Sequence, residues 1–195
     1  MQNKVKWLVM ASGAGTTFEH LVKAKTKKNY EIIGLIASSE KADVLAKAKS
    51  AGVPSKIINP SMSANSTELL IKSIETFKPD FILLAGYLKK IEENVIRNFA
   101  GRMFNSHPSL LPKYGGHGMY GSNVHKQVFQ NKEKISGVTI HEVNEEFDQG
   151  RIVFQQPIDI QPCKSWEEVE SLVKSLEKEF LVDCLNRKKV EWTGG

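Results

Sequence analysis

Apolar runs of strand length alternate with helix-like segments through the first half of the chain, and this alternation restricts the fold more than any other feature. A strand, a helix and a second strand in succession are typical of a parallel sheet with crossover helices. The pattern therefore predicts an α/β fold that begins doubly wound, with helices on both faces of the sheet. We expect strands at 7–11, 30–37, 55–58, 81–85 and 102–105, and helices at 17–27, 41–51, 65–77 and 92–99.

The second half of the chain changes character after residue 107. Residues 108–122 have few periodic apolar positions and include four glycines within seven residues, which predicts a mobile loop. Beyond a short helix at 123–130, strands at 137–143 and 151–160 are separated by a short turn, so we expect them to pair antiparallel. The last helix, at 165–185, opens with Ser165 and Glu168 at the spacing of a capping box.

The sequence shows no internal repeat and no linker. This predicts one domain over residues 1–195, with an N-terminal half of about 1–100 and a C-terminal half of about 101–195.

Composition and charge disfavour several classes of protein. Hydrophobic residues make up 41% and charged residues 25% of the sequence, which are ordinary globular values. The apolar runs are far short of the roughly 20 residues of a membrane helix, and no cleavage site follows the first run, so we expect a cytoplasmic protein without membrane contact. The net charge is +5 with scattered lysines, which favours solvated helix faces over a nucleic-acid site and is compatible with small anionic substrates.

A glycine-rich turn, Ser-Gly-Ala-Gly-Thr-Thr at 12–17, lies between the first expected strand and helix. Free backbone N–H groups at such a helix start suit a phosphate group. The dinucleotide fingerprint is incomplete, because Phe18 stands where its third glycine would fall. A turn that serves only tight strand-to-helix packing explains the glycines equally well.

Asn105 and His107 lie two residues apart at the end of an expected strand, so period-two geometry places both side chains on one face. An asparagine N–H can stabilise an oxyanion and a histidine can exchange protons near neutral pH, so the pair fits acyl or formyl transfer. In the functional interpretation Asp148, from the acidic turn 144–150, approaches His107 and raises the pKa of its imidazole. The alternative is a histidine that satisfies a loop hydrogen bond beside an ordinary solvated turn.

The other potential metal ligands lack the spacing that a metal site needs. His141 alternates with apolar residues, which indicates an ordinary strand position. Cys163 and Cys184 share no ligand spacing and are too few for a disulfide framework, so we expect reduced thiols. We assign no metal to the remaining histidines, which are His20, His117 and His125.

Several longer motifs resemble the glycinamide ribonucleotide formyltransferase family in order and spacing, and the match runs from about Val5 to the last helix. They are NSHPSLLPKY at 105–114, GVTIHEV at 137–143 and DQGRIVFQQ at 148–156. The stretch GHGMYGSNVH at 116–125 resembles a variant form of the family's loop. The resemblance implies a single Rossmann-like domain with a mostly parallel central sheet and an antiparallel C-terminal strand pair.

By that resemblance the chain transfers a formyl group from the co-substrate 10-formyltetrahydrofolate to the amine of 5'-phosphoribosylglycinamide, giving formylglycinamide ribonucleotide in de novo purine biosynthesis. It implies no metal, only small-molecule ligands, a monomer or homodimer, and a cis peptide between Leu111 and Pro112. The implied catalytic residues are Asn105, His107 and Asp148. The implied substrate contacts are Gly15, Thr16, Thr17 and Glu177, and the implied folate contacts are Leu88, Lys89, Lys90, Ile91, Asn105, Asn144, Glu145, Glu146, Phe147 and Asp148.

Two departures from the family's pattern concern ligand contacts. Ala14 and Thr17 stand where asparagines are common in the substrate turn, which preserves backbone contacts to phosphate but removes or shortens the side-chain contacts. Lys89 and Ser63 stand where arginines are common near the folate. Lysine keeps the charge without the planar fork that pairs carboxylates bidentately.

Alternative functions come from two classes. Methionyl-tRNA formyltransferase and formyltetrahydrofolate deformylase resemble the same core, but they normally carry an extra C-terminal and N-terminal domain, respectively, whereas here the core fills the sequence. A non-enzymatic nucleotide-binding module would use only the glycine-rich turn. That module would leave Asn105, His107 and Asp148 without a joint role.

Overall fold

The computed structural model describes residues 4–24, 29–59 and 65–193. Its centre is a seven-stranded sheet in the order β3-β2-β1-β4-β5-β6-β7. Strands β3 to β5 in this order run parallel, whereas β6 pairs antiparallel with both β5 and β7. The predicted α/β sheet with an antiparallel C-terminal pair is therefore confirmed. The strands are β1 Val5–Ala11, β2 Tyr30–Ala37, β3 Ser55–Ile57, β4 Phe81–Leu84, β5 Met103–His107, β6 Ile135–Glu142 and β7 Ile152–Asp159.

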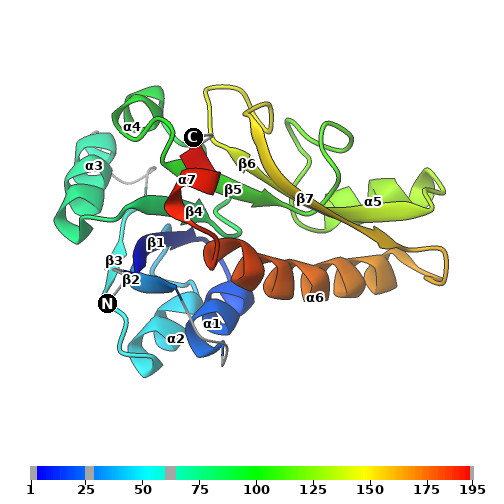
Figure 1. Cartoon of the computed structure of the whole chain (residues 1–195), viewed down its shortest axis with the longest axis horizontal. Helices are drawn as coiled ribbons and strands as arrows, with labels where there is room; N and C mark the ends of the chain where they lie inside the picture. The colour runs from blue at the N-terminus through cyan, green and yellow to red at the C-terminus, as the bar shows by residue number, and fades with distance from the viewer. Residues whose placement is uncertain (1–3, 25–28, 60–64, 194–195) are drawn as a thin grey trace.

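Helices cover both faces of the sheet (Figure 1). One face packs against α1 Thr16–Lys23, α2 Val44–Ser50, α5 Ser122–Gln130 and α6 Trp166–Leu185, and the other against α3 Ser66–Phe77 and α4 Glu93–Asn98. The strand order reverses between β1 and β4, since the chain runs from β1 outward to β3 and then returns to β4 on the other side of β1. In open α/β sheets, ligands bind at the carboxyl ends of the strands at such a switch point. None of the helices in the described ranges is long and apolar enough to span a membrane.

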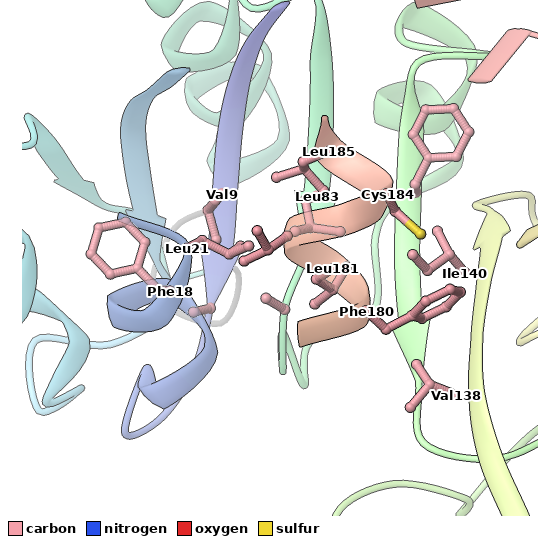
Figure 2. Packing of buried hydrophobic residues seen from close by; sticks show 14 of the residues in the cluster. Val9, Phe18, Leu21, Leu83, Val138, Ile140, Phe180, Leu181, Cys184 and Leu185 are labelled. Carbon is pink, nitrogen blue, oxygen red and sulfur yellow. The ribbon is translucent and has the colours of Figure 1, made fainter. Parts of the chain in front are cut away.

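Strand β1 divides the core in two because its side chains alternate between the faces. Trp7 and Val9 belong to the cluster beneath α1 and α6, whereas Leu8 and Met10 belong to the cluster beneath α3 and α4, and all four are fully buried. A parallel strand buried on both faces reads as a continuous apolar run, which is why the sequence located β1. Figure 2 shows how α6 packs on this sheet through its labelled side chains Phe180, Leu181, Cys184 and Leu185.

Some element ends differ from the sequence-based expectation. Strand β5 continues to His107, two residues further than expected, because β6 pairs with it there. Helix α2 begins at Val44, three residues later than expected. Helix α1 ends at Lys23, and residues 25–27 of the expected helix lie outside the described residues, as does Ser63.

Two local predictions hold at the level of hydrogen bonds and peptide geometry. Ser165 caps α6 by accepting the N–H of Glu168 at 3.3 Å. The reciprocal bond of the capping box is displaced by one residue, because the Glu168 carboxylate accepts from the N–H of Lys164 at 2.6 Å. The peptide between Leu111 and Pro112 is cis, as the resemblance implied.

A further helix, α7 Lys189–Thr193, was not expected from the sequence. Its Trp192 is fully buried, with ring centroids 4.6 Å from Trp7 and 4.8 Å from Phe104. Arg151 Nη2 donates to the Trp192 carbonyl at 2.7 Å. A five-residue segment has too little local stability to be helical alone, so tertiary packing of Trp192 places α7.

Candidate active site

Strand β5 turns Asn105 and His107 away from α6. Phe104 is buried in the core beneath α6, so the alternation of the strand directs Asn105 and His107, one and three residues further on, to the opposite face. Strand β6 continues the same face, since its antiparallel register sets His141 opposite Asn105 and Thr139 opposite His107. Both histidines are only 3% exposed. Two adjacent strands therefore bring four polar side chains together.

Asp148 reaches this group from the turn between β6 and β7. Its Oδ2 lies 3.5 Å from His107 Nδ1, and its Oδ1 lies 3.4 Å from His141 Nε2. The Gly116 N–H donates to Oδ2 at 2.9 Å. Asp148 has φ 58°, a left-handed conformation that aspartate tolerates better than most residues. One carboxylate thus joins β5, β6 and the glycine-rich loop of residues 108–122.

Backbone carbonyls determine which nitrogen of each imidazole carries the proton. His107 Nε2 lies 2.7 Å from the Tyr114 carbonyl oxygen, and His141 Nδ1 lies 3.0 Å from the Glu142 carbonyl oxygen. Because a carbonyl only accepts, both nitrogens must be protonated. In the neutral rings the opposite nitrogens hold lone pairs, and Asn105 Nδ2 donates to His141 Nε2 at 3.1 Å. His107 Nδ1, facing the carboxylate, is the atom at which that ring gains or loses a proton.

Burial dominates the electrostatics of the two groups that face each other. It lowers the pKa of His107, and this effect exceeds the opposing effect of the Asp148 charge, so the expectation of a raised pKa was wrong. Burial raises the pKa of Asp148, but a hydrogen bond from the protonated ring of His141, the charge of the protonated ring of His107 and the Gly116 N–H together bring it below its usual value. At neutral pH the protein therefore holds a neutral His107 beside an ionised Asp148.

Thr139 anchors the loop that supplies the Tyr114 carbonyl. Its hydroxyl donates to the Ser109 carbonyl at 2.6 Å and accepts the Leu111 N–H at 3.0 Å. Gln155 Nε2 donates to the Thr139 hydroxyl and to the Leu111 carbonyl, each at 2.9 Å. These bonds tie the start of the loop to β6 and β7. They thereby support the carbonyl that selects the imidazole tautomer.

The glycine-rich turn lies at the carboxyl end of β1 and leads into α1. Gly15 has φ 65°, and a Cβ there would lie 2.3 Å from Val44 Cγ2, so only glycine allows this approach to α2. Packing against α2 therefore requires a glycine at this position. It does not exclude a ligand, because the first N–H groups of α1, at Thr16 and Thr17, have no carbonyl one turn earlier to bond.

Glu177 of α6 connects this turn to the polar strand. Thr17 Oγ1 donates to Glu177 Oε2 at 3.2 Å, and Ser106 Oγ donates to Oε1 at 2.6 Å. Burial raises the pKa of Glu177, although the two hydroxyls act against it. Ser106 points to the opposite face of β5 from Asn105 and His107, so the strand separates the carboxyl of Glu177 from that of Asp148.

The segment expected to contact folate after β4 has mixed surroundings. Leu88 is 58% exposed, and Lys89 and Lys90 are also exposed. Ile91 is buried in the core beneath α3 and α4, so its side chain faces away from solvent. Only its backbone is left for a ligand.

The second such segment, 144–148, makes several local contacts. The Asn144 side chain accepts the Glu146 N–H at 3.2 Å, and Glu145 lies 3.4 Å from the guanidinium of the arginine on α4. Phe147 is 49% exposed, and its ring centroid lies 6.3 Å from that of His117 in the glycine-rich loop. The two loops therefore meet beside Asp148.

A family model described as formyl transferase matches residues 5–185, which is nearly the whole chain. The chain belongs to the formyl transferase family. The fold is that of the family as well, since the structure of a phosphoribosylglycinamide formyltransferase from Coxiella burnetii, solved in complex with CHES, superposes with a TM-score of 0.87. That protein is 29% identical, and the match covers 94% of this chain and 86% of the other.

Two curated relatives of this formyl transferase have the same name as the Coxiella burnetii protein, phosphoribosylglycinamide formyltransferase. The chloroplastic phosphoribosylglycinamide formyltransferase of Vigna unguiculata is 34% identical over 96% of this chain and 62% of its own length. The chain thus spans less than two thirds of that plant protein. The phosphoribosylglycinamide formyltransferase of Bacillus subtilis is 29% identical over 90% of this chain and 90% of its own length.

Three side chains of this formyl transferase site were missed by sequence reasoning. His141 and Thr139 have the same two-residue spacing as Asn105 and His107, which was the available signal, but the pairing of β6 with β5 that sets these residues opposite one another was not predicted. Ser106 carried no signal, because its partner lies on a distant helix. Across the described residues, no group of three or more histidine, cysteine, aspartate or glutamate side chains is arranged to hold a metal ion.

Proposed function

We propose that this formyl transferase transfers the formyl group of 10-formyltetrahydrofolate to the amine of 5'-phosphoribosylglycinamide, giving formylglycinamide ribonucleotide for purine biosynthesis. The observation that carries the proposal is the meeting of His107, Asp148 and Asn105 at the carboxyl end of β5, with His107 Nδ1 3.5 Å from Asp148 Oδ2. The names of the plant and bacterial relatives support the choice of acceptor.

In the proposed reaction the substrate amine attacks the formyl carbon, and the formyl oxygen becomes an oxyanion. The amide N–H of Asn105 stabilises that charge, and the ring of His107 adds a positive charge once it has been protonated. His107 is neutral in the free protein and therefore takes up the proton that the amine loses, at Nδ1 beside the Asp148 carboxylate. When the bond from the formyl carbon to N10 of the folate breaks, N10 accepts this proton, and the reaction is balanced.

The substrate's phosphate is assigned to the start of α1. Backbone N–H groups of Gly15, Thr16 and Thr17 lie at a helix N-terminus, where the helix dipole favours an anion. The resemblance to the family assigns Glu177 to the amine side of the substrate, and its hydrogen bond from Thr17 links it to the turn that is assigned to the phosphate. Holding both reactants in one place supplies much of the remaining rate.

The folate is assigned to two loops, residues 88–91 after β4 and residues 144–148, the second of which contains the catalytic carboxylate. In one loop the exposed side chain of Leu88 offers apolar contact, and Lys89 and Lys90 offer positive charge for carboxylates, while Ile91 contributes its backbone only. The other loop contributes Asn144, Glu145, Glu146, Phe147 and Asp148. In this assignment the N-terminal half, about 1–100, binds phosphate, and the C-terminal half, about 101–195, carries catalysis.

A turnover assay with three acceptors tests the proposal. Purified protein and 10-formyltetrahydrofolate are incubated with glycinamide ribonucleotide, with water alone, or with initiator methionyl-tRNA. We expect formylation of the ribonucleotide only. Formate release in water alone would instead indicate a deformylase, and formylated tRNA would indicate the tRNA enzyme. A cytoplasmic location and a monomeric or homodimeric state stay predictions, which fractionation and sedimentation would test.

A further inference from the structure

Ser12 stands at the carboxyl end of β1, at the switch point between β1 and β4. Its N–H donates to the Gly86 carbonyl at 3.0 Å, which crosses from β1 to the segment after β4. Its hydroxyl accepts the Leu88 N–H at 2.8 Å and the hydroxyl of Ser38 at 2.8 Å. Ser12, which follows β1, therefore binds the segments that follow the two neighbouring strands, β2 and β4.

The two hydrogen bonds that the Ser12 hydroxyl accepts come from one buried residue and one exposed residue. Ser38 is 2% exposed and follows β2, so it holds the hydroxyl from the core side. Leu88 is 58% exposed, so its side chain is not held by packing and its N–H is tied to the body of the protein through Ser12. The preceding Gly86 has φ 69°, and its carbonyl accepts the Ser12 N–H, so the segment after β4 makes two hydrogen bonds with Ser12.

The same serine also begins the glycine-rich turn. Gly13 follows it directly, and the Gly13 carbonyl accepts the Val44 N–H at 3.2 Å, which sets the turn against α2. The segment assigned to phosphate and the segment assigned to folate are therefore joined through one side chain. A shift of either segment moves the Ser12–Leu88 hydrogen bond.

We propose that Ser12 is a positioning residue that couples the binding of the two substrates through its hydrogen bond to the Leu88 N–H. This inference rests on the proposed function, which assigns a ligand to each segment. A ligand that orders the glycine-rich turn fixes Ser12 and, through Ser12, the start of the folate loop. The second ligand then binds with a smaller loss of conformational entropy. By linkage the effect is reciprocal, and each substrate strengthens the binding of the other by the same factor.

Calorimetric titration of a non-reacting pair measures this coupling. Tetrahydrofolate, which carries no formyl group, is titrated into the protein with and without saturating glycinamide ribonucleotide. We expect the ribonucleotide to tighten tetrahydrofolate binding in the wild type by about 3- to 10-fold, the worth of one hydrogen bond. Ser12→Ala should abolish this factor. The matched variant Ser38→Ala, which leaves the Ser12–Leu88 bond in place, should keep it.

A second measurement needs no variant. In the wild type, saturating ribonucleotide alone should slow hydrogen exchange at the Leu88 amide, although the ligand is assigned to the other segment. Equal coupling in wild type and Ser12→Ala, or exchange at Leu88 that does not respond to the ribonucleotide, would overturn the inference. Turnover of the wild type is measured in parallel. Turnover without coupling rejects only the role of Ser12, whereas no turnover with the ribonucleotide rejects the proposed function.

Discussion

Acid should destabilise this protein through His125, a histidine of α5 that the proposed chemistry does not use. The side chain is 1% exposed, and its Nδ1 has no hydrogen-bond partner among the described residues. Burial lowers its pKa from 6.5 to about 4, and the charge of Glu170 only partly opposes this. The folded protein therefore resists a proton that the unfolded chain accepts readily.

The size and sign of the effect follow from the two pKa values. Between pH 6.5 and about 4 the unfolded state binds more protons than the folded state, so stability falls as the pH falls through this window. Each pH unit in the window contributes about 1.4 kcal/mol, which gives a loss of about 3 kcal/mol by pH 4. Domains of this kind are stable by about 5–15 kcal/mol, so the loss is large enough to measure.

Urea denaturation from pH 8 to pH 4 tests this reasoning with two variants. His125→Leu removes the titrating ring, so the stability of the wild type relative to this variant should fall by about 3 kcal/mol across the series. Val128→Ala removes a 1% exposed side chain of the same helix that does not titrate, and its destabilisation should stay constant with pH. A difference between wild type and His125→Leu that does not change with pH would refute the argument.

Three further predictions concern the site itself. His107→Ala should lower turnover by about 100-fold or more while ribonucleotide affinity stays near the wild-type value, and near-normal turnover in steady-state assays would reject the mechanism. Asp148→Asn removes the charge that raises the pKa of His107, so NMR titration should find that pKa lower still, and an unchanged value would contradict the pairing. A Cβ at Gly150 would lie 1.7 Å from the Glu142 carbonyl oxygen, so Gly150→Ala should cost about 1–3 kcal/mol in thermal unfolding. Gly13→Ala, where nothing lies within 4 Å of the added atom, is the control and should melt close to the wild type.

Local pattern was sufficient for most of the fold. Strand β2 spans Tyr30–Ala37, as predicted, because the strand is apolar apart from Glu31 and its residues 34–37 are buried on both faces. The start of α6 was readable from Ser165, because a capping hydrogen bond lies within four residues of chain. The α7 helix was not readable, since the contacts that stabilise it come from rings distant in sequence.

The sequence by itself determined which residue types stand at each strand end, including Asn105 and His107 on one face of β5 and a carboxylate at Asp148. Only the tertiary structure decided that His141, 36 residues from Asn105, lies beside these side chains. The reason is that strand register depends on pairing partners that local sequence does not specify. It also decided the direction of the pKa shift of His107. Proximity to Asp148 could be guessed from residue types, but the burial that outweighs it exists only once the chain is packed.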